Sequence, residues 1–412
     1  MTDKLPHSRG KESSEIILLA GKEFEDAPLL FFHDMSALHV LDLSYTSVNS
    51  SPQSISKLNA LQKLILRDCD FLIELPPEIG ELTNLERVSI SNLSRLNELR
   101  IDVNPDGDWW DVEVKTIIHD LCSLRELRTL ELYLPTIELL EELIQNSPLL
   151  ICPALTHFRF IVGHQVERFL SRLPLEVEEE FNNLEKSEKG LKYVNGEEIP
   201  IEIIEEIVKE MIVMNLNSTH ILMRKKWYFG SLQYLSIHYM KNMESICQGS
   251  VGKGCLSSLK FLAWHTCLSL TTVFTVGMLR NLSNLEELIV ENCTRISNLV
   301  GLKYSDSKSG HFLPNLKKIL LLELPKLVSI SNGLCIAPKL ERIFIFFCPK
   351  LVKLSTMKVS SKDLKVIKGE NEWWGALKWH ESDLSSDHQD YLASVFVPLR
   401  RDGDLMAQFT KD

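Results

Sequence analysis

One spacing of apolar residues recurs along the chain. A leucine is followed three positions later by an aliphatic or aromatic residue and two positions after that by a third apolar residue, as in Leu61, Leu64 and Leu66. Because successive side chains of a strand point to opposite sides, each copy predicts one short strand with an apolar side. The poorest copy is the last one, which has Gly369 in its third place. The copies begin at Leu38, Leu61, Leu85, Leu96, Leu127, Leu155, Leu232, Leu259, Leu285, Leu316, Leu340 and Leu364.

Many of the intervals between copies are 23 to 31 residues, which is the length of a leucine-rich repeat. A single unit of this length cannot bury its apolar side, whereas stacked units share a continuous core. The pattern therefore predicts an α/β leucine-rich-repeat solenoid. We expect a curved horseshoe with short parallel strands on its concave face and an irregular or helical convex side.

Two intervals break the pattern. Leu85 and Leu96 are only 11 residues apart, so one repeat there is damaged or one of the two anchors is false. Leu155 and Leu232 are 77 residues apart, with no clean copy between them. The sequence therefore predicts two groups of repeats that are separated by an interruption.

The long interruption is acidic and contains a helical pattern. Residues 176–210 hold twelve Glu and four Lys. At its end, Ile201, Ile204, Val208 and Met211 share one face at helical spacing. We expect an amphipathic helix that either docks a partner or covers the side of the solenoid.

The last repeat is followed by three tryptophans, Trp373, Trp374 and Trp379. A solenoid must close the open end of its core, so these residues predict a terminal cap. Together these patterns divide the chain into five parts. The parts are a lead-in or capping segment at 1–30, N-terminal repeats at 31–161 with a helical insertion near 103–122, an acidic, partly helical, irregular insertion at 162–230, C-terminal repeats with the Trp-rich cap at 231–380, and a mobile tail at 381–412.

Four of the nine cysteines, Cys69, Cys267, Cys293 and Cys348, occupy the same place in their repeats. A thiol is a small hydrophobic group that fits the tight end of a strand. A metal or redox centre would require these thiols to converge, whereas a solenoid spaces them along its axis. An odd number of scattered cysteines also indicates reduced thiols, and the polar N-terminus lacks the apolar segment of a secretory signal. We therefore expect a cytoplasmic or nuclear protein.

The sequence contains no pattern that predicts an enzyme or a cofactor. The stretch "CQGSVGKGC" resembles a phosphate-binding loop but has Cys247 in place of the first glycine and Gly254 in place of the hydroxyl residue. The pairs His265 with Cys267 and His380 with His388 are weak candidates for a metal site. Most of the net charge of −11 lies in the acidic interruption, and no apolar run approaches the length of a membrane span. We expect no catalytic residue, cofactor, metal, nucleic-acid partner or membrane span.

The remaining candidate for function is a surface for another protein. If Leu316, Ile319 and Leu321 point into the core, the residues between them must point out, and the next repeat places aromatic residues there. Strands that are apolar on both faces are usually covered on both faces, so either a partner or the chain's own terminal segment covers this strip. The candidate partner-binding residues are Ile289, Glu291, Lys318, Leu320, Leu322, Arg342, Phe344 and Phe346.

The repeats resemble those of plant intracellular disease-resistance proteins, in the coiled-coil class of nucleotide-binding leucine-rich-repeat immune receptors. The resemblance covers roughly residues 30–385 and is carried by "LPPEIGELTNLE", "LRNLSNLEELIVENC", "PNLKKILLLELPKLVSI" and, most specifically, the Trp-Trp segment "IKGENEWWGALKWHESD". Such receptors usually carry a coiled coil and a nucleotide-binding switch before the repeats. The resemblance implies a repeat domain that holds this switch off and helps to recognise pathogen effectors or guarded host proteins.

The chain departs from that family pattern, because it begins almost directly with the repeats and contains no phosphate-binding loop. Nucleotide binding is therefore not carried over to it, and a truncated or decayed receptor copy is one alternative. Another alternative is an F-box-type ubiquitin-ligase adaptor, since "LPLEVEEEF" and "IPIEIIEEIV" resemble the start of such a box. A repeat enzyme or an enzyme inhibitor is a third alternative, and no group of residues supports it.

Overall fold

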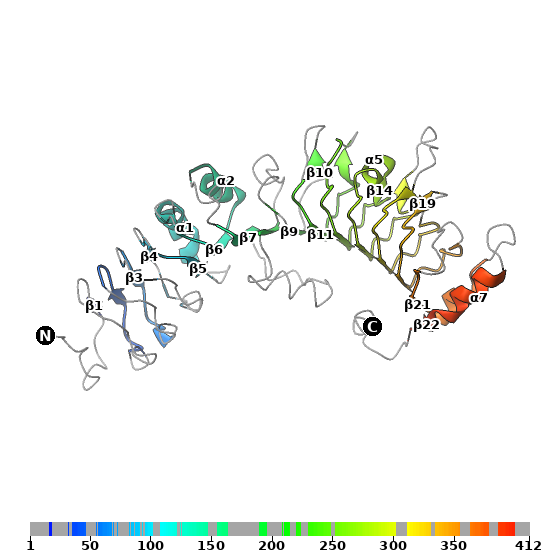
Figure 1. The fold of residues 1–412 in the computed structure, drawn as a ribbon. Helices are drawn as coiled ribbons and strands as arrows, with labels where there is room; N and C mark the ends of the chain where they lie inside the picture. Colours follow the sequence, from blue (N-terminus) through cyan, green and yellow to red (C-terminus); the bar gives the residue numbers. More distant parts are fainter. Residues whose placement is uncertain are drawn as a thin grey trace. The chain divides into compact units, whose positions relative to one another are not determined.

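A computed structural model describes most of the chain between residues 16 and 399, and its ribbon is drawn in Figure 1. The described residues form two compact units, Met1–Phe169 with Asn182–Val194 and Leu170–Phe181 with Asn195–Asp412. The description leaves out residues 1–15, 19–31, 47–54, 73–81, 102–107, 147–154, 164–188, 196–207, 215–219, 224–229, 302–310, 355–362, 379–385 and 400–412, together with shorter stretches of one to three residues.

The first unit contains two sets of parallel strands. The first set is β1 (Ile16–Leu18), β2 (Val40–Asp42), β3 (Lys63–Ile65) and β4 (Arg87–Ser89). The second set is β5 (Glu98–Ile101), β6 (Thr129–Leu134), β7 (His157–Gly163) and β8 (Lys189–Val194). Two helices follow β5 and β6, namely α1 (Asp108–Leu121) and α2 (Ile137–Asn146).

The short interval between Leu85 and Leu96 marks a change of sheet. Both leucines are fully buried, and each leads into a strand, β4 and β5 respectively. These two strands belong to different sheets, and helix α1 packs on β4, where the Asp120 carboxylate accepts a hydrogen bond of 3.1 Å from the backbone N–H of Ile90. The expectation that one anchor is false was therefore wrong. An abrupt spacing occurs where one sheet ends and the next begins.

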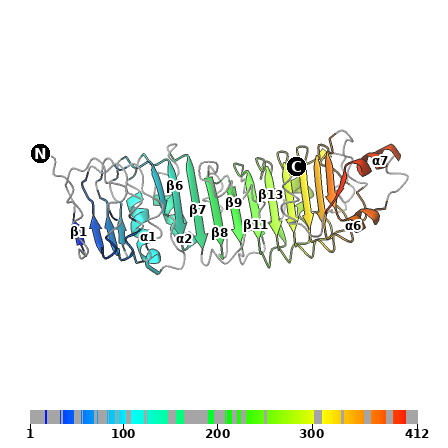
Figure 2. The ribbon, with the colours of Figure 1, turned by 90° about the horizontal axis from the view of Figure 1, so that it is seen from below.

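The second unit has a row of parallel strands that lie side by side (Figure 2). Adjacent strands are paired in register from β9 to β22. They are β9 (Glu210–Met214), β11 (Tyr234–His238), β13 (Phe261–His265), β15 (Glu287–Glu291), β18 (Lys318–Leu322), β20 (Arg342–Phe346), β21 (Val366–Gly369) and β22 (Phe396–Pro398).

The opposite side of the second unit carries shorter elements (Figure 1). Three parallel pairs form there, β10 (His220–Met223) with β12 (Ser245–Gln248), β14 (Phe274–Thr275) with β16 (Val300–Gly301), and β17 (His311–Phe312) with β19 (Cys335–Ile336). The short helix α5 (Val276–Leu279) begins at Thr275, whose hydroxyl accepts a hydrogen bond from the backbone N–H of Met278. The parallel-strand solenoid predicted from the leucine spacing is confirmed.

The core is built from the residues that the template selects. All twelve anchoring leucines are at most 2% exposed. In β13, Leu262 and Trp264 point into the core and are fully buried, and Leu288 holds the equivalent place in β15. Between neighbouring coils, the backbone N–H groups of Lys260 and Phe261 both donate to the carbonyl of Gln233. Each coil therefore depends on its neighbours for both apolar contacts and backbone hydrogen bonds.

The recurring cysteines are buried at the ends of strands. The Sγ atoms of Cys267, Cys293 and Cys348 donate to the carbonyl two residues earlier at 3.4–3.5 Å. Cys348 also donates to the carbonyl of Leu321 in the preceding coil at 3.5 Å. Burial raises the pKa of the Cys348 thiol to about 12. These thiols act as small buried residues that satisfy carbonyl groups at a tight turn.

The end of the C-terminal repeats is closed by helix α6 (Asn371–Gly375). A Cβ atom on Gly369 would lie 2.6 Å from Cε3 of Trp373, so the indole occupies the space in which other repeats have a core side chain. The indole N–H of Trp373 donates to the carbonyl of Leu351 at 2.8 Å. The weak third place of the last template therefore has a cause, because a larger residue there would exclude the cap.

The structure differs from the sequence prediction after the cap, where the sequence predicted a mobile tail. Residues Ser386–Ser394 form helix α7, and β22 extends the sheet by pairing with β21. The ring of Trp374 stacks on Phe396 with 4.2 Å between centroids. Trp379 and His380 lie outside the described residues, as does the side chain of His388.

The predicted amphipathic helix is also corrected at its C-terminal end. Met211 is buried in strand β9, and Val208 is buried just before it, whereas Ile201 and Ile204 lie outside the described residues. The run "EMIVM" satisfies both a helical period and a short apolar strand. Parallel pairing with β11 favours the strand, and tertiary pairing of this kind is not visible in a local pattern.

Among the described residues, no helix is both long enough and apolar enough to cross a membrane.

Candidate functional site

The outward side chains of β11, β13, β15, β18, β20 and β21 form one continuous surface, which we call the C-terminal strand face. The in-register pairing arranges its residues in three rows that cross the strands. The first row is Tyr234, Phe261, Glu287, Lys318, Arg342 and Val366; the middle row is Ser236, Ala263, Ile289, Leu320, Phe344 and Lys368; and the third row is His238, His265, Glu291, Leu322 and Phe346.

All eight partner-binding candidates from the sequence fall on this face. They occupy the three adjacent strands β15, β18 and β20. Lys318 and Arg342 are neighbours in the first row, and the other six are divided between the middle and third rows. Alternation along the strands was therefore sufficient to select residues that the fold brings together.

The exposure expected for these residues was wrong for most of them. Ile289, Leu320 and Phe344 are only 1–2% exposed, Leu322 is 5% exposed, and Phe346 is half-buried. Strands about 4.8 Å apart place large side chains of one row in lateral contact, so an outward-pointing side chain still loses water on both flanks. Alternation distinguishes the two faces of a strand but does not establish that the outer face is wet.

Cations border the apolar middle row. The Lys318 ammonium lies 3.0 Å from a Glu287 carboxylate oxygen and 5.9 Å from the centre of the Phe344 ring. The Lys368 ammonium lies 5.2 Å from the same ring. Such a cation and ring arrangement is attractive because the ring face is the negative part of its quadrupole. Phe344 is thus held by charge as well as by lateral packing.

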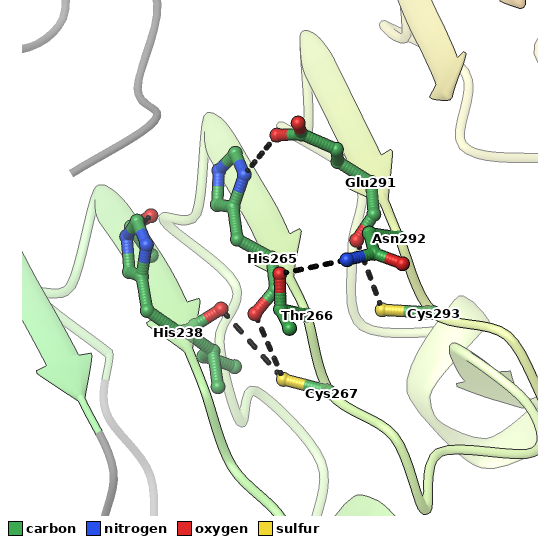
Figure 3. Close-up of polar contacts among 9 residues, drawn as sticks. His238, His265, Thr266, Cys267, Glu291, Asn292 and Cys293 are labelled. Carbon is green, nitrogen blue, oxygen red and sulfur yellow. Dashed lines mark hydrogen bonds and ion pairs between the residues drawn. The ribbon is translucent and has the colours of Figure 1, made fainter. Parts of the chain in front are cut away.

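The third row contains a buried polar cluster that sequence reasoning missed (Figure 3). The rings of His238 and His265 stack with 4.5 Å between centroids and an angle of 13°. His265 Nδ1 and Glu291 Oε2 are 2.7 Å apart, and the exposed fractions of His238, His265 and Glu291 are 0%, 1% and 7%. Aligning the repeats would have revealed this cluster, because both histidines occupy the template position held by Glu291.

The chemistry of this cluster is set by which atoms are paired. The Ser236 hydroxyl is 2.7 Å from His238 Nε2, whereas the Glu291 carboxylate is paired with the other imidazole. A hydrolytic triad needs one histidine between the hydroxyl and the carboxylate. Here the two halves are on different histidines, and the Nε2 atom of His265 is buried without a hydrogen-bond partner. The arrangement orders the ends of three strands rather than activating a nucleophile.

The backbone just beyond this cluster turns sharply. Thr266 and Asn292, which follow β13 and β15, have positive φ angles of 54° and 49°. The Asn292 side-chain amide donates to the Thr266 hydroxyl at 3.4 Å, and Cys267 and Cys293 lie directly behind them (Figure 3). His265 and Cys267 therefore lie on opposite sides of a turn, with the imidazole on the strand face and the thiol in the core. Among the described residues, no group of histidine, cysteine, aspartate and glutamate is arranged to hold a metal ion.

Residues 231–368 match the family described as "Plant disease resistance protein RPS2-like, leucine-rich repeats". These residues are leucine-rich repeats of the plant disease-resistance type. The matched range covers the strands from β11 to nearly the end of β21 and thus the entire C-terminal strand face.

Curated relatives carry the same description. The chain is 23% identical over 477 residues to Disease resistance protein At4g27190 of Arabidopsis thaliana, a match that covers 96% of this chain and 46% of that protein. It is 38% identical over 85 residues to Putative disease resistance protein At4g19050 of Arabidopsis thaliana, covering 21% of this chain and 7% of that protein. It is 30% identical over 101 residues to TMV resistance protein N of Nicotiana glutinosa, covering 22% and 9%. The chain thus spans about half the length of the first relative and less than a tenth of the other two.

Two solved structures of leucine-rich-repeat proteins are also similar. One is the leucine-rich repeat domain of APL1B, at 13% identity and a TM-score of 0.29, covering 96% of this chain and 91% of that chain. The other is a leucine-rich repeat protein from Bacteroides thetaiotaomicron, at 9% identity and a TM-score of 0.26, covering 90% and 50%. The fold assignment rests on the strand register described above and not on these superpositions.

Proposed function

We propose that this chain is the recognition and regulatory repeat region of an intracellular plant immune receptor, and that it binds protein without catalysing a reaction. The observation that carries the proposal is the coincidence of two features. The disease-resistance repeats at 231–368 are the same residues that form the C-terminal strand face, with its apolar middle row and its border of Lys318, Arg342 and Lys368.

The partner in this proposal is a pathogen effector, a guarded host protein, or the nucleotide-binding module of a receptor. An apolar strip with a charged border is the usual composition of a protein-binding surface. The buried cluster of His238, His265 and Glu291 supports binding rather than chemistry, because its hydrogen bonds hold neighbouring strands together.

A cytoplasmic or nuclear location is part of the same proposal. The six cysteines in the described part of the chain are all free, and four of them recur at one place in the repeat. Reduced thiols of this kind are typical of compartments in which thiols are kept reduced.

Proximity labelling in leaf tissue, with and without a pathogen, tests this function. Phe346→Ser changes a half-buried residue of the strand face, and Val328→Ser changes a residue that is 51% exposed and belongs to none of the three rows. We expect a defined set of proteins to be labelled by the wild type and by Val328→Ser, and to be lost with Phe346→Ser. Circular dichroism verifies that both variants are folded. Identical labelling by all three chains would show that the strand face does not select the partner.

A further inference from the structure

The burial of the C-terminal strand face requires a cover. An outward-pointing row on an open sheet has lateral neighbours only, so the tips of its side chains keep some contact with water. Ile289, Leu320 and Phe344 are nevertheless at most 2% exposed. In addition, six residues of the face take part in an interaction beyond those described above, namely Tyr234, His238, Glu291, Arg342, Phe344 and Lys368.

We propose that residues 400–412 of the same chain dock on the middle row and occupy the partner surface in the free protein. The segment starts in the right place. Leu399 is the last described residue, and its backbone N–H donates to the carbonyl of Gly369 at 2.8 Å, at the end of β21. The following residue therefore leaves the sheet beside Lys368 and two strands from Leu320.

The reach of the segment is sufficient. From β21 to β15 there are three strand spacings of about 4.8 Å, or roughly 14 Å. Six residues in extended conformation, from 400 to 405, span roughly 20 Å. Leu405 can thus lie over Ile289, and the residues that follow it can cover the rest of the middle row.

The order of chemical groups also matches. Asp402 and Asp404 come first after Leu399 and meet the cationic border formed by Lys368 and Arg342. Three large apolar side chains follow within five residues, Leu405, Met406 and Phe409. The acidic pair is therefore beside the cations and the apolar group is beside Phe344, Leu320 and Ile289.

This inference rests on the proposed function only in its consequence, which is that a partner must displace the segment before it binds. The docking itself is an intrachain contact and can be measured without any partner. The segment then acts as an internal competitor that keeps an apolar surface out of water, where it would otherwise promote association.

A photo-crosslinker in the full chain tests the docking directly. Benzoylphenylalanine replaces Phe409, and the crosslinked peptides are identified by mass spectrometry. We expect crosslinks to peptides that contain β15, β18 or β20. Crosslinks confined to other parts of the chain, or none at all, overturn the proposal even if every other variant were to unfold.

Substitutions in the full chain provide a second measurement. Leu405, Met406 and Phe409 are changed together to Ser, and Gln408→Ser is the matched control within the same segment. In the triple variant we expect higher bis-ANS fluorescence and faster hydrogen exchange in β15, β18 and β20, both reversed by a synthetic peptide of residues 400–412. Unchanged exchange in the triple variant contradicts docking. If docking is found but neither the triple variant nor Phe346→Ser alters proximity labelling, the proposed function fails and the intrachain contact stands.

Discussion

Substitution of Gly369 tests the packing of the C-terminal cap. A Cβ atom at this position would approach Trp373 to 2.6 Å at Cε3 and 2.7 Å at Cζ3, and it would lie 3.4 Å from the carbonyl oxygen of Ile345. The indole belongs to a rigid ring with a hydrogen bond to Leu351, so it cannot move by a few tenths of an ångström as a flexible side chain would. Gly369→Ala should therefore displace the ring from the end of the core.

The magnitude follows from two opposing effects. Overpacking of a core typically costs about 1–3 kcal/mol. Replacing glycine by alanine also reduces the entropy of the unfolded chain and stabilises by about 0.4–1 kcal/mol. We expect a net destabilisation of about 1–2 kcal/mol, with the steric effect dominating because the contact is far shorter than any van der Waals distance.

A double-mutant cycle identifies the cause. Trp373→Ala alone should cost about 3–5 kcal/mol, as a buried tryptophan truncation. In the double variant, the alanine methyl group enters space that the indole has left, so adding Gly369→Ala should cost almost nothing further. The coupling between the two positions should be about 1–2 kcal/mol, within the range seen for residues in contact.

The assay is urea denaturation followed by circular dichroism, with hydrogen exchange in β20, β21 and β22 to localise the effect. Gly375→Ala is the matched control, because no atom lies within 4 Å of a Cβ built there and alanine is favourable in a helix. Additive effects of Gly369→Ala and Trp373→Ala would refute the steric argument. Equal behaviour of Gly369→Ala and Gly375→Ala would refute it as well.

Three further predictions concern buried groups. Burial raises the pKa of the Cys348 thiol from 9.0 to about 12, so the native state keeps this proton where the unfolded state loses it; stability should therefore fall as pH rises from about 9 to 12, and the urea midpoint should fall less in Cys348→Ala. Phe344→Ser should destabilise by about 3–5 kcal/mol because Phe344 is 2% exposed, whereas Phe346→Ser should cost about 1 kcal/mol, and similar urea midpoints for the two variants would contradict this assignment. Glu291→Leu should cost about 1–3 kcal/mol more than Glu291→Gln, because only glutamine keeps an acceptor for the buried Nδ1 of His265; equal unfolding free energies for these two variants would show that the bond contributes nothing.

The sequence was sufficient to locate the residues of the candidate site but not their surroundings. Leu320 and Phe344 were identified as outward-pointing because a period of two residues fixes the side of each strand. Their burial was not predicted, since it depends on lateral neighbours in other repeats and on what covers the face. His238 and His265 were overlooked as a pair, because 27 residues separate them in the chain and only the parallel register of β11 and β13 places their rings together.

The interruption between the two groups of repeats illustrates a second limit. Glu210–Met214 reads equally well as one turn of an amphipathic helix and as a short buried strand. The free energy that separates these states comes from backbone hydrogen bonds and apolar contacts with β11, which are outside any local window. The same reasoning applies to Phe396–Pro398, which the sequence placed in a mobile tail and which pairs with β21.

By itself, the sequence determined the repeat, the direction of every anchoring leucine and the place of the buried cysteines, because these depend only on strand alternation and on the need of each coil to bury one side. The tertiary structure decided where one sheet ends and the next begins, that Trp373 replaces a core side chain over Gly369, and that the outer face of the C-terminal strands is dry. The physical reason is common to all three: each depends on contacts between residues of different repeats, whose free energy no single repeat contains.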